Sequence, residues 1–207
     1  MEKVFIAVPT YENIYPDTMK CIWELGRHEG NAELMFDFVR GYSVDSARNR
    51  CVHKAKEAGA DRILFVDNDV TFGPDFLGNL MEHDEDVVLG YYLHRGEDGR
   101  KGLTNLCKTG QHSYIEQISA EEMGGALEDG YDLVEVKGGG LGFGLVRLSV
   151  FDRFLYPWFR FVEWGDGGVL SEDLYFSEQC ANNGIKVYAD PRCYCGHLFR
   201  ETKGGLL

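Results

Sequence analysis

Short apolar runs alternate with segments of helical periodicity through the first 90 residues, and this alternation limits the fold more than any other feature of the chain. The apolar runs cover residues 4–8, 63–66 and 87–89, and residues 33–39 form a further strand candidate. Between them lie three segments with apolar residues at helical spacing, which begin near Pro16, Val44 and Gly73. Continuous apolar runs are typical of strands buried on both faces of a parallel sheet. The pattern therefore predicts an α/β fold with a mostly parallel central sheet and helices on both faces.

The second part of the chain is less regular. Residues 95–130 are rich in Gly, Lys and Glu and are expected to form surface excursions. Further strands are predicted at 133–136 and 185–189, with a short helix near 149–154 and a longer helix over 171–183. No Ser/Pro-rich linker divides the 207 residues, so we expect one domain over 1–207.

The charge balance excludes two classes of partner. Against 21 Lys and Arg stand 34 Asp and Glu, a net charge of −13. A protein held on nucleic acid needs a basic face, and so does a polybasic membrane contact, so neither partner is expected. No apolar run approaches the roughly 18 residues of a membrane span, and the N-terminus lacks the layout of a signal peptide. We therefore expect a cytoplasmic protein without an integral membrane segment, whose six cysteines are thiols.

Asp67-Asn68-Asp69 follows directly after the apolar run 63–66. Ligands of α/β sheets bind at the carboxyl ends of strands, and paired carboxylates there suit Mg²⁺ or Mn²⁺ together with substrate phosphates. The alternative is an Asx turn, in which both aspartates bond to local backbone. Both interpretations remain open from the residues alone.

Glu172 and Asp173 begin the helix predicted over 171–183. Ser171 is a plausible N-cap, and two carboxylates in the first turn favour the helix dipole, which would explain the pair without any function. However, Asp173 shares a stripe with Phe176 and Cys180, which are expected to face inward. An inward carboxylate needs a partner or a chemical role, such as that of a general base.

Other features are weaker. The glycine run 138–144 is neither a P-loop nor a dinucleotide fingerprint, and either tight turns or close approach to a ligand would explain it. Arg48 lies one position off the apolar stripe of its helix, where it is either solvated or in reach of a phosphate. In the tail, Arg200 and Lys203 either hold a diphosphate or belong to a frayed end.

Cys193, Cys195 and His197 have the same parity, so on an extended segment their side chains would point to one side. A zinc site is conceivable there, although the spacing is unusual and a fourth ligand is missing. Aromatic residues offer one more option: Tyr156, Trp158 and Trp164 either form a sugar-binding platform or belong to the core.

Taken in order, these segments resemble the GT-A glycosyltransferases over nearly the whole chain. The resemblance rests on an opening strand and turn, an Ala-Arg-Asn helix segment, a D-x-D motif, a glycine-rich acceptor segment, an x-Glu-Asp helix start and a closing strand with a histidine. These correspond to residues 6–11, 46–49, 67–69, 142–147 with Phe151, 171–176, and 190–191 with 196–197.

The resemblance implies a metal-dependent transfer of a sugar from a UDP- or GDP-linked donor to a carbohydrate or other hydroxyl acceptor. It also implies a nucleotide-binding half over 1–90 and an acceptor and metal half over 91–207. Mn²⁺ or Mg²⁺ would be bound by Asp67, Asp69 and His197, and Asp173, with Glu172 beside it, would supply the base of an inverting reaction. The donor would be lined by Pro9, Thr10, Tyr11, Glu12, Arg48, Asp67, Asn68, Arg200 and Lys203, and the acceptor by Gly140, Gly142 and Trp164.

Two other functions remain open at this point. A nucleotidyltransferase would also use a cation and phosphates, but it would offer a glycine-rich, basic loop where this chain has Thr10-Tyr11-Glu12-Asn13. A sugar- or nucleotide-binding module without turnover would keep the donor site but would not depend on Asp173.

Overall fold

The computed structural model describes residues 1–11, 13–28, 30–41, 43–94, 102–111, 114–163, 165 and 167–198. The first half of the chain forms β1 (Glu2–Thr10), α1 (Pro16–His28), β2 (Ala32–Arg40), α2 (Val44–Glu57), β3 (Arg62–Val66), β4 (Val70–Thr71), α3 (Phe76–Met81) and β5 (Val87–Tyr91). The second half forms β6 (Leu103–Gln111), β7 (Tyr114–Ser119), α4 (Ala120–Glu128), β8 (Val134–Val136), β9 (Gly138–Gly139), β10 (Phe143–Arg147), the 3₁₀ helix η1 (Leu148–Asp152), β11 (Val162–Glu163), β12 (Val169–Leu170), α5 (Glu172–Asn182), β13 (Val187–Tyr194) and β14 (Gly196–His197).

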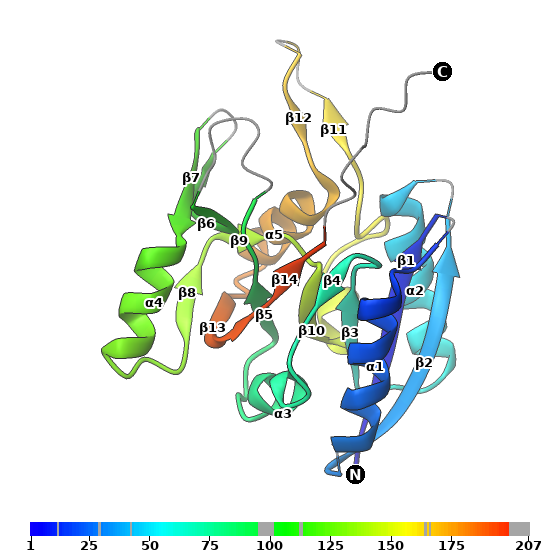
Figure 1. The fold of residues 1–207 in the computed structure, drawn as a ribbon. Coiled ribbons are helices and arrows are strands. Elements are labelled where there is room, and N and C mark those ends of the chain that lie inside the picture. Colours follow the sequence, from blue (N-terminus) through cyan, green and yellow to red (C-terminus); the bar gives the residue numbers. More distant parts are fainter. Residues whose placement is uncertain are drawn as a thin grey trace, which may run out of the picture.

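A mixed sheet lies at the centre of the molecule (Figure 1). Within the described residues it has seven strands in the order β2-β1-β3-β10-β5-β13-β8. β2, β1, β3, β5 and β13 run in one direction, while β10 and β8 run against their neighbours. The predicted α/β class with a mostly parallel sheet is therefore confirmed. β10 comes from the second half of the sequence and lies between β3 and β5 of the first half.

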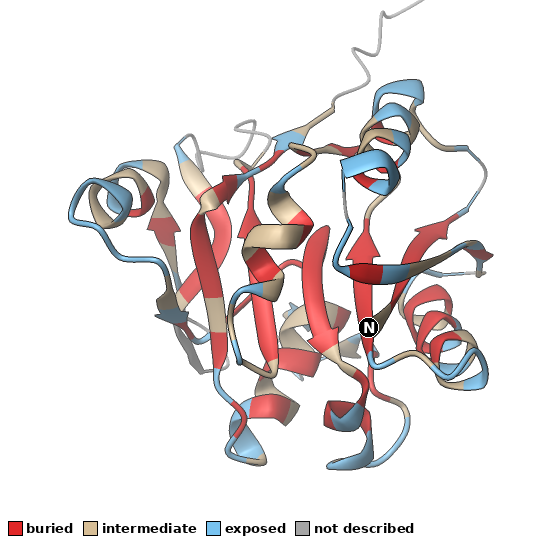
Figure 2. Cartoon of the chain, turned by 90° about the horizontal axis from the view of Figure 1, so that it is seen from below, coloured by how far each residue is buried: buried red, intermediate tan, exposed pale blue. Residues whose placement is uncertain are grey.

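Each face of the sheet is covered by helices that bury an apolar stripe. α1 and α3 cover one face, where Ile22, Leu25, Leu77 and Leu80 pack against the strands. α2, α4 and α5 contribute to the core on the other face. Figure 2 shows that buried residues are concentrated in the strands between these layers. Because both faces are covered, β1, β3 and β5 have the continuous apolar sequences from which they were predicted, whereas β2, at the edge of the sheet, is only partly buried.

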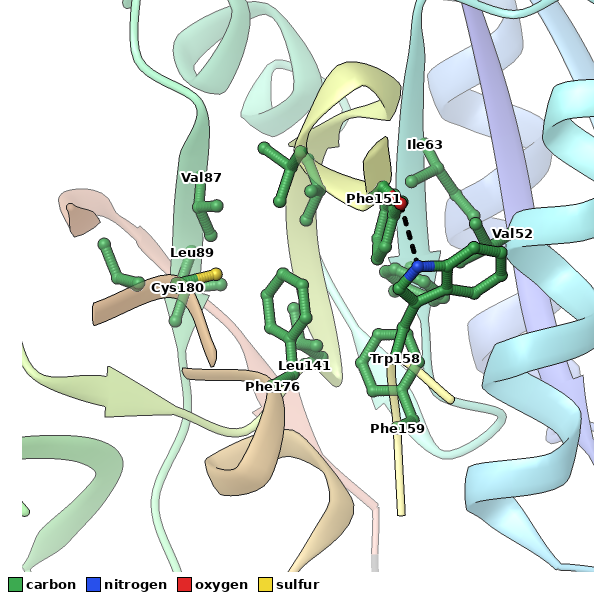
Figure 3. Packing of buried hydrophobic residues seen from close by; sticks show 14 of the residues in the cluster. Val52, Ile63, Val87, Leu89, Leu141, Phe151, Trp158, Phe159, Phe176 and Cys180 are labelled. Atoms are coloured by element: carbon green, nitrogen blue, oxygen red, sulfur yellow. Dashed lines mark hydrogen bonds between the residues drawn. The ribbon is translucent and has the colours of Figure 1, made fainter. Parts of the chain in front are cut away.

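An aromatic cluster fills the core under α2 and α5 (Figure 3). The ring of Phe151 contacts those of Trp158, Phe159 and Phe176, and the rings of Phe159 and Phe176 stack on each other. The indole nitrogen of Trp158 donates to the carbonyl oxygen of Phe151 at 2.8 Å, and only 6% of Trp158 is exposed. Trp158 is therefore a core residue, so the core alternative is confirmed for it and the sugar-binding platform is not. Tyr156 is exposed, and Trp164 lies outside the described residues.

Most element positions follow the sequence pattern, with three main differences. β10, in the middle of the sheet, was not among the predicted strands. The expectation of irregular excursions over 95–130 is wrong for residues 103–111 and 114–128, which form the β6–β7 hairpin and α4. Ser119 caps α4 through a capping box with Glu122. The helix expected from Gly73 begins only at Phe76. None of the helices in the described part of the chain is long and apolar enough to span a bilayer.

A short antiparallel pair of strands, separate from the central sheet, joins two segments that are distant in the sequence. β14 pairs with β4, with Gly196 opposite Thr71 and His197 opposite Val70. The amide of Leu198 also donates to the carbonyl oxygen of Asp69 at 2.8 Å. This pairing brings His197 beside the loop that follows β3.

Candidate active site

A cavity of about 330 Å³ opens at the carboxyl ends of β1, β2 and β3. This is the edge at which open α/β sheets bind ligands. Four parts of the chain form its wall: the end of β1, the β2–α2 connection with the start of α2, the loop after β3, and His197 of β14. The lining residues are Pro9, Thr10, Tyr11, Gly41, Ser43, Val44, Ala47, Asp67, Asn68, Asp69 and His197.

Asn68 ties the loop after β3 to the loop after β1. Its side-chain amide donates to the carbonyl oxygen of Asn13 at 2.6 Å, and its own carbonyl oxygen accepts from the amide of Tyr15 at 3.0 Å. Thr10 donates from its hydroxyl to the same oxygen of Asn13 at 3.1 Å. These bonds fix the rim of the cavity. The side chains of Thr10 and Asn68 therefore also have a structural role.

Asp69 and His197 form a pair in the wall of the cavity. Nε2 of His197 lies 3.5 Å from Oδ2 of Asp69, and the β14–β4 pairing sets the backbone positions of both. A carboxylate oxygen and an imidazole nitrogen therefore face one another in a cavity that also contains Asp67.

Arg48 is the centre of a buried ionic network between α2, α5 and the loop after β3. Its Nη2 lies 2.9 Å from Oδ1 of Asp67, and its Nε lies 3.1 Å from Oε1 of Glu172. Its Nη1 donates to the carbonyl oxygen of Leu141 at 3.2 Å. Only 2% of the Arg48 side chain is exposed. The guanidinium thus bonds to protein groups on three sides and does not line the cavity.

The network shifts the pKa values of its members. Burial raises the pKa of Asp67 above its ordinary value, although Arg48 acts in the opposite direction. Burial likewise raises the pKa of Glu172, with Arg48 opposing and Asp173 adding to the shift. For Arg48, burial opposes the charged form, but the carboxylates of Asp67 and Glu172 outweigh it and raise its pKa. Arg48 therefore stays charged, and additional positive charge in the cavity would stabilise Asp67.

Asp173 faces the protein at the start of α5. Its Oδ1 accepts from the amide of Leu174 at 2.8 Å and from the hydroxyl of Ser171. Its Oδ2 would lie 3.3 Å from a Cβ atom built on Gly140. The stripe predicted for Phe176 and Cys180 is confirmed, since both are buried. Ser171 occupies the N-cap position, but its side chain makes no capping bond to the helix backbone.

Tyr92 separates Asp173 from the cavity residue His197. Its ring lies 4.9 Å from that of His197, and its Oη would lie 2.5 Å from a Cβ atom on Gly140 and 2.7 Å from one on Gly142. Burial raises the pKa of Tyr92 well above its ordinary value, and the charges of Asp67 and Asp173 add to this shift. The phenol is therefore neutral near pH 7. Gly140 and Gly142 leave room for it, since any side chain there would overlap the phenol.

The donor chemistry of the cavity fits Mg²⁺ or Mn²⁺. Among the described residues, no three His, Cys, Asp or Glu side chains converge closely enough to hold a metal ion by themselves. Asp69 and His197 nevertheless offer an oxygen and a nitrogen 3.5 Å apart, and these ions commonly bind through one or two protein groups together with substrate phosphates and water. Asp67 lines the same cavity with one oxygen engaged by Arg48, so its role as a third ligand stays a prediction.

The structure does not support the alternative zinc site. Cys193 and Cys195 are buried in the apolar core beneath α3. The thiol of Cys193 lies 3.7 Å from the carbonyl oxygen of Phe76. All six cysteines are free thiols, as predicted.

The predicted site residues fall into three groups. Those that line the cavity are Pro9, Thr10, Tyr11, Asp67, Asn68, Asp69 and His197. Those that lie behind it in the Arg48 network or around Tyr92 are Arg48, Glu172, Asp173, Gly140 and Gly142. Glu12, Trp164, Arg200 and Lys203 lie outside the described residues, and their roles stay predictions.

Sequence reasoning missed two parts of the site. The first is the β2–α2 connection, where Gly41, Ser43 and Val44 line the cavity. It directly follows a predicted strand at the same sheet edge as Thr10, so its position could have identified it. The second is Tyr92. Its position beside His197 and Gly140 depends on contacts between segments that are distant in the sequence, which no local pattern predicts.

Comparisons with known proteins agree with this architecture. No protein-family model matches the chain, and no curated protein matches it by sequence. Among solved structures, A197 from STIV is similar with a TM-score of 0.60 and 19% identity, over 97% of this chain and 87% of the other. GalNAc-T7, solved with UDP, GalNAc and Mn²⁺, is similar with a TM-score of 0.62 and 11% identity, over 96% of this chain and 44% of the other.

The chain has the GT-A fold of glycosyltransferases. At identities this low the similarity establishes the fold and not the activity. The predicted resemblance is confirmed at that level, and the reaction must be argued from the cavity itself.

Proposed function

We propose that this protein is a metal-dependent glycosyltransferase, which transfers a sugar from a nucleoside-diphosphate sugar to a hydroxyl group of an acceptor. The observation that carries the proposal is the meeting of the loop after β1, the Asp67–Asp69 loop and His197 in one cavity at the carboxyl edge of a GT-A sheet. The complex of GalNAc-T7 with UDP, GalNAc and Mn²⁺ supports it by analogy of fold.

The cavity residues divide the work of binding the donor. Thr10 and Tyr11 would contact the nucleoside, and Asn68 holds the loop that carries them. Asp69 and His197 would hold the cation, with Asp67 as a further ligand or a contact to the sugar. When bound, Mn²⁺ or Mg²⁺ neutralises the charge of the leaving diphosphate, which a protein of net charge −13 needs.

Asp173 does not line the donor cavity but borders Gly140, a predicted acceptor residue, and it is proposed as the general base of an inverting transfer to an acceptor bound on that side. The acceptor oxygen would form a bond to the anomeric carbon while the bond from that carbon to the diphosphate breaks. Asp173 would take the proton that the hydroxyl loses. Glu172 acts through Arg48, to which it is bonded at 3.1 Å, and so helps to hold Asp67.

The first experiment measures donor binding without any assumption about the acceptor. The melting temperature is recorded with a panel of UDP- and GDP-linked sugars, each with Mn²⁺ and with EDTA. Binding to the folded state raises the melting temperature by mass action. A shift for one donor that is lost with EDTA and in Asp69→Asn supports the proposal. No shift with any donor and metal would overturn it.

The second experiment separates transfer from binding alone. Release of the nucleoside diphosphate from the donor identified above is measured with water or a simple saccharide as acceptor. Asp173→Asn is expected to keep the donor-dependent shift and to lose turnover by about 10²-fold or more. A wild-type protein that binds the donor but releases no diphosphate would instead be a non-catalytic binding module.

A further inference from the structure

Tyr92 lies directly after β5, and its ring packs against the imidazole of His197. The two ring centroids are 4.9 Å apart, with an angle of 57° between the ring planes. His197 in turn lies 3.5 Å from Asp69. Tyr92 therefore supports one side of the imidazole, whose other neighbour here is a carboxylate of the cavity.

The other end of Tyr92 reaches the surroundings of Asp173. A Cβ atom on Gly140 would lie 2.5 Å from the Tyr92 hydroxyl and 3.3 Å from Oδ2 of Asp173, so these two oxygens border the same small space. Gly142 leaves further room, because a Cβ atom there would lie 2.7 Å from the hydroxyl and 2.8 Å from Cε1 of the ring. One side chain thus spans the distance between His197 and the proposed base.

The backbone of Tyr92 is fixed on both sides by a single buried residue. Its amide donates to Oδ1 of Asn105 at 2.9 Å, and its carbonyl oxygen accepts from the amide of Asn105 at 3.0 Å. The side-chain amide of Asn105 also donates to the carbonyl oxygen of Gly140 at 3.0 Å. Asn105 therefore fixes the backbone of Tyr92 relative to that of Gly140.

We propose that Tyr92 is a positioning residue that links the two halves of the site: its ring orients His197 for the cation, and its hydroxyl orders the space in front of Asp173. The inference rests on the function proposed above and adds a residue to it. Residues that orient a metal ligand commonly change metal affinity or activity 10- to 100-fold when they are replaced. Tyr92 combines such a contact with a second one at the opposite end of the same side chain.

Two variants separate the ring from the hydroxyl. Tyr92→Phe keeps the ring against His197 and removes only the hydroxyl, whereas Tyr92→Leu removes both. Tyr91 supplies the matched control, because it is the neighbouring buried tyrosine and its ring stacks on Tyr194, away from His197, at 5.1 Å. Tyr91→Phe and Tyr91→Leu are compared in the same assays. If Tyr92→Leu does not fold, Tyr92→Met replaces it.

The first measurement is Mn²⁺ binding, followed by the electron paramagnetic resonance signal of free Mn²⁺ in the presence of UDP or GDP. Tyr92→Leu is expected to weaken Mn²⁺ binding about 10-fold or more, while Tyr92→Phe and both Tyr91 variants remain within about twofold of wild type. Equal binding in Tyr92→Leu and wild type would overturn the role of the ring.

The second measurement is donor turnover. Tyr92→Phe is expected to lower kcat about 10-fold with an unchanged KM for the donor, because the hydroxyl acts beside Asp173 and not on the nucleotide. An unchanged kcat would overturn the role of the hydroxyl. A wild-type protein that binds no Mn²⁺ with either nucleotide would refute the proposed function itself, an outcome distinct from any difference between the variants.

Discussion

Arg48 and Glu172 lie 124 positions apart in the chain and form a buried ion pair at 3.1 Å. The same guanidinium reaches Asp67 at 2.9 Å. The start of α5 and the loop after β3 are therefore held by one side chain of α2. A buried pair of this kind contributes little net stability by itself, but removing one partner leaves an uncompensated charge.

We therefore expect Arg48→Met to destabilise the protein by about 3–5 kcal/mol, measured by urea unfolding at pH 7. Adding Glu172→Leu should restore part of this loss, because the buried carboxylate is then gone as well. The rise in melting temperature on donor binding should be small in Arg48→Met and also in the double variant, because Asp67 lacks its Arg48 partner in both. If the loss in the double variant equals the sum of the losses in Arg48→Met and in Glu172→Leu alone, the two residues are not coupled.

The glycine segment next to Tyr92 gives a steric prediction. Gly140→Ala would bring a Cβ atom within 2.5 Å of the Tyr92 hydroxyl, so we expect a loss of about 1–3 kcal/mol in stability and a larger loss of donor turnover. Gly124→Ala is the matched control, because nothing lies within 4 Å of the place that its added Cβ atom would occupy on α4. It should be neutral or stabilise by up to about 1 kcal/mol. A larger loss of stability in Gly124→Ala than in Gly140→Ala would contradict the close approach of Gly140 to the Tyr92 hydroxyl.

The buried thiols should resist alkylation in the native state. Burial raises the pKa values of Cys51, Cys107 and Cys180 to about 12 and those of Cys193 and Cys195 well above their ordinary value. The thiolate is the reactive form, so these groups should not react at pH 8. Intact-mass analysis after brief iodoacetamide treatment should find modification at the partly exposed Cys21 alone, and at all six cysteines in urea. Rapid native labelling of Cys180 would contradict the buried environment.

Asp190 gives a prediction about acid stability. It is fully buried, and burial would raise its pKa, but hydrogen bonds from Arg192 at 2.7 Å and from His83 at 3.0 Å outweigh this and hold the pKa below its ordinary value. Its stabilising contribution is therefore present above about pH 4 and is lost as the pH falls through the lowered pKa. Asp190→Asn should cost about 2 kcal/mol at pH 7, and the difference from wild type should shrink toward pH 3. A constant difference in urea unfolding at both pH values would refute this.

Asn49 provides a prediction about the aromatic core. Its Oδ1 accepts from the amides of Trp158 and Phe159 at 3.0 and 3.2 Å, and its Nδ2 donates to the carbonyl oxygen of Phe159 at 2.7 Å. Asn49→Leu leaves these buried backbone groups without their partner, so we expect a loss of about 2–4 kcal/mol in thermal or urea unfolding. Arg50→Ala, an exposed change on the same helix, should stay within about 0.5 kcal/mol.

The layered fold could be predicted because its signals are local. The apolar runs that became β1, β3 and β5 are buried on both faces, so their composition alone marks them. β10 was not predicted, because the glycine run before it offers no periodicity and its antiparallel pairing with β3 joins residues about 80 positions apart. The β6–β7 hairpin was missed because its polar, glycine-containing sequence resembles a loop.

In the candidate site too, residues with a local signal could be predicted, and those whose place depends on distant contacts could not. Asp67 and Asp69 are recognisable because they end a buried strand, and Asp173 because it shares a stripe with Phe176. Arg48 was expected at the donor, yet its guanidinium lies behind the cavity wall with Glu172 and Asp67. A helix position one step from the apolar stripe does not reveal which acidic groups the fold will place beside it.

The pairing of β14 with β4 has a consequence for the order in which the protein matures. During synthesis, Asp69 leaves the ribosome more than a hundred residues before His197, so a nascent chain with β1 to β5 complete still lacks the imidazole that faces this carboxylate. The cavity can therefore acquire both groups only after residue 197 has emerged. Any cation affinity that depends on this pair should appear late and abruptly in a series of chains of increasing length.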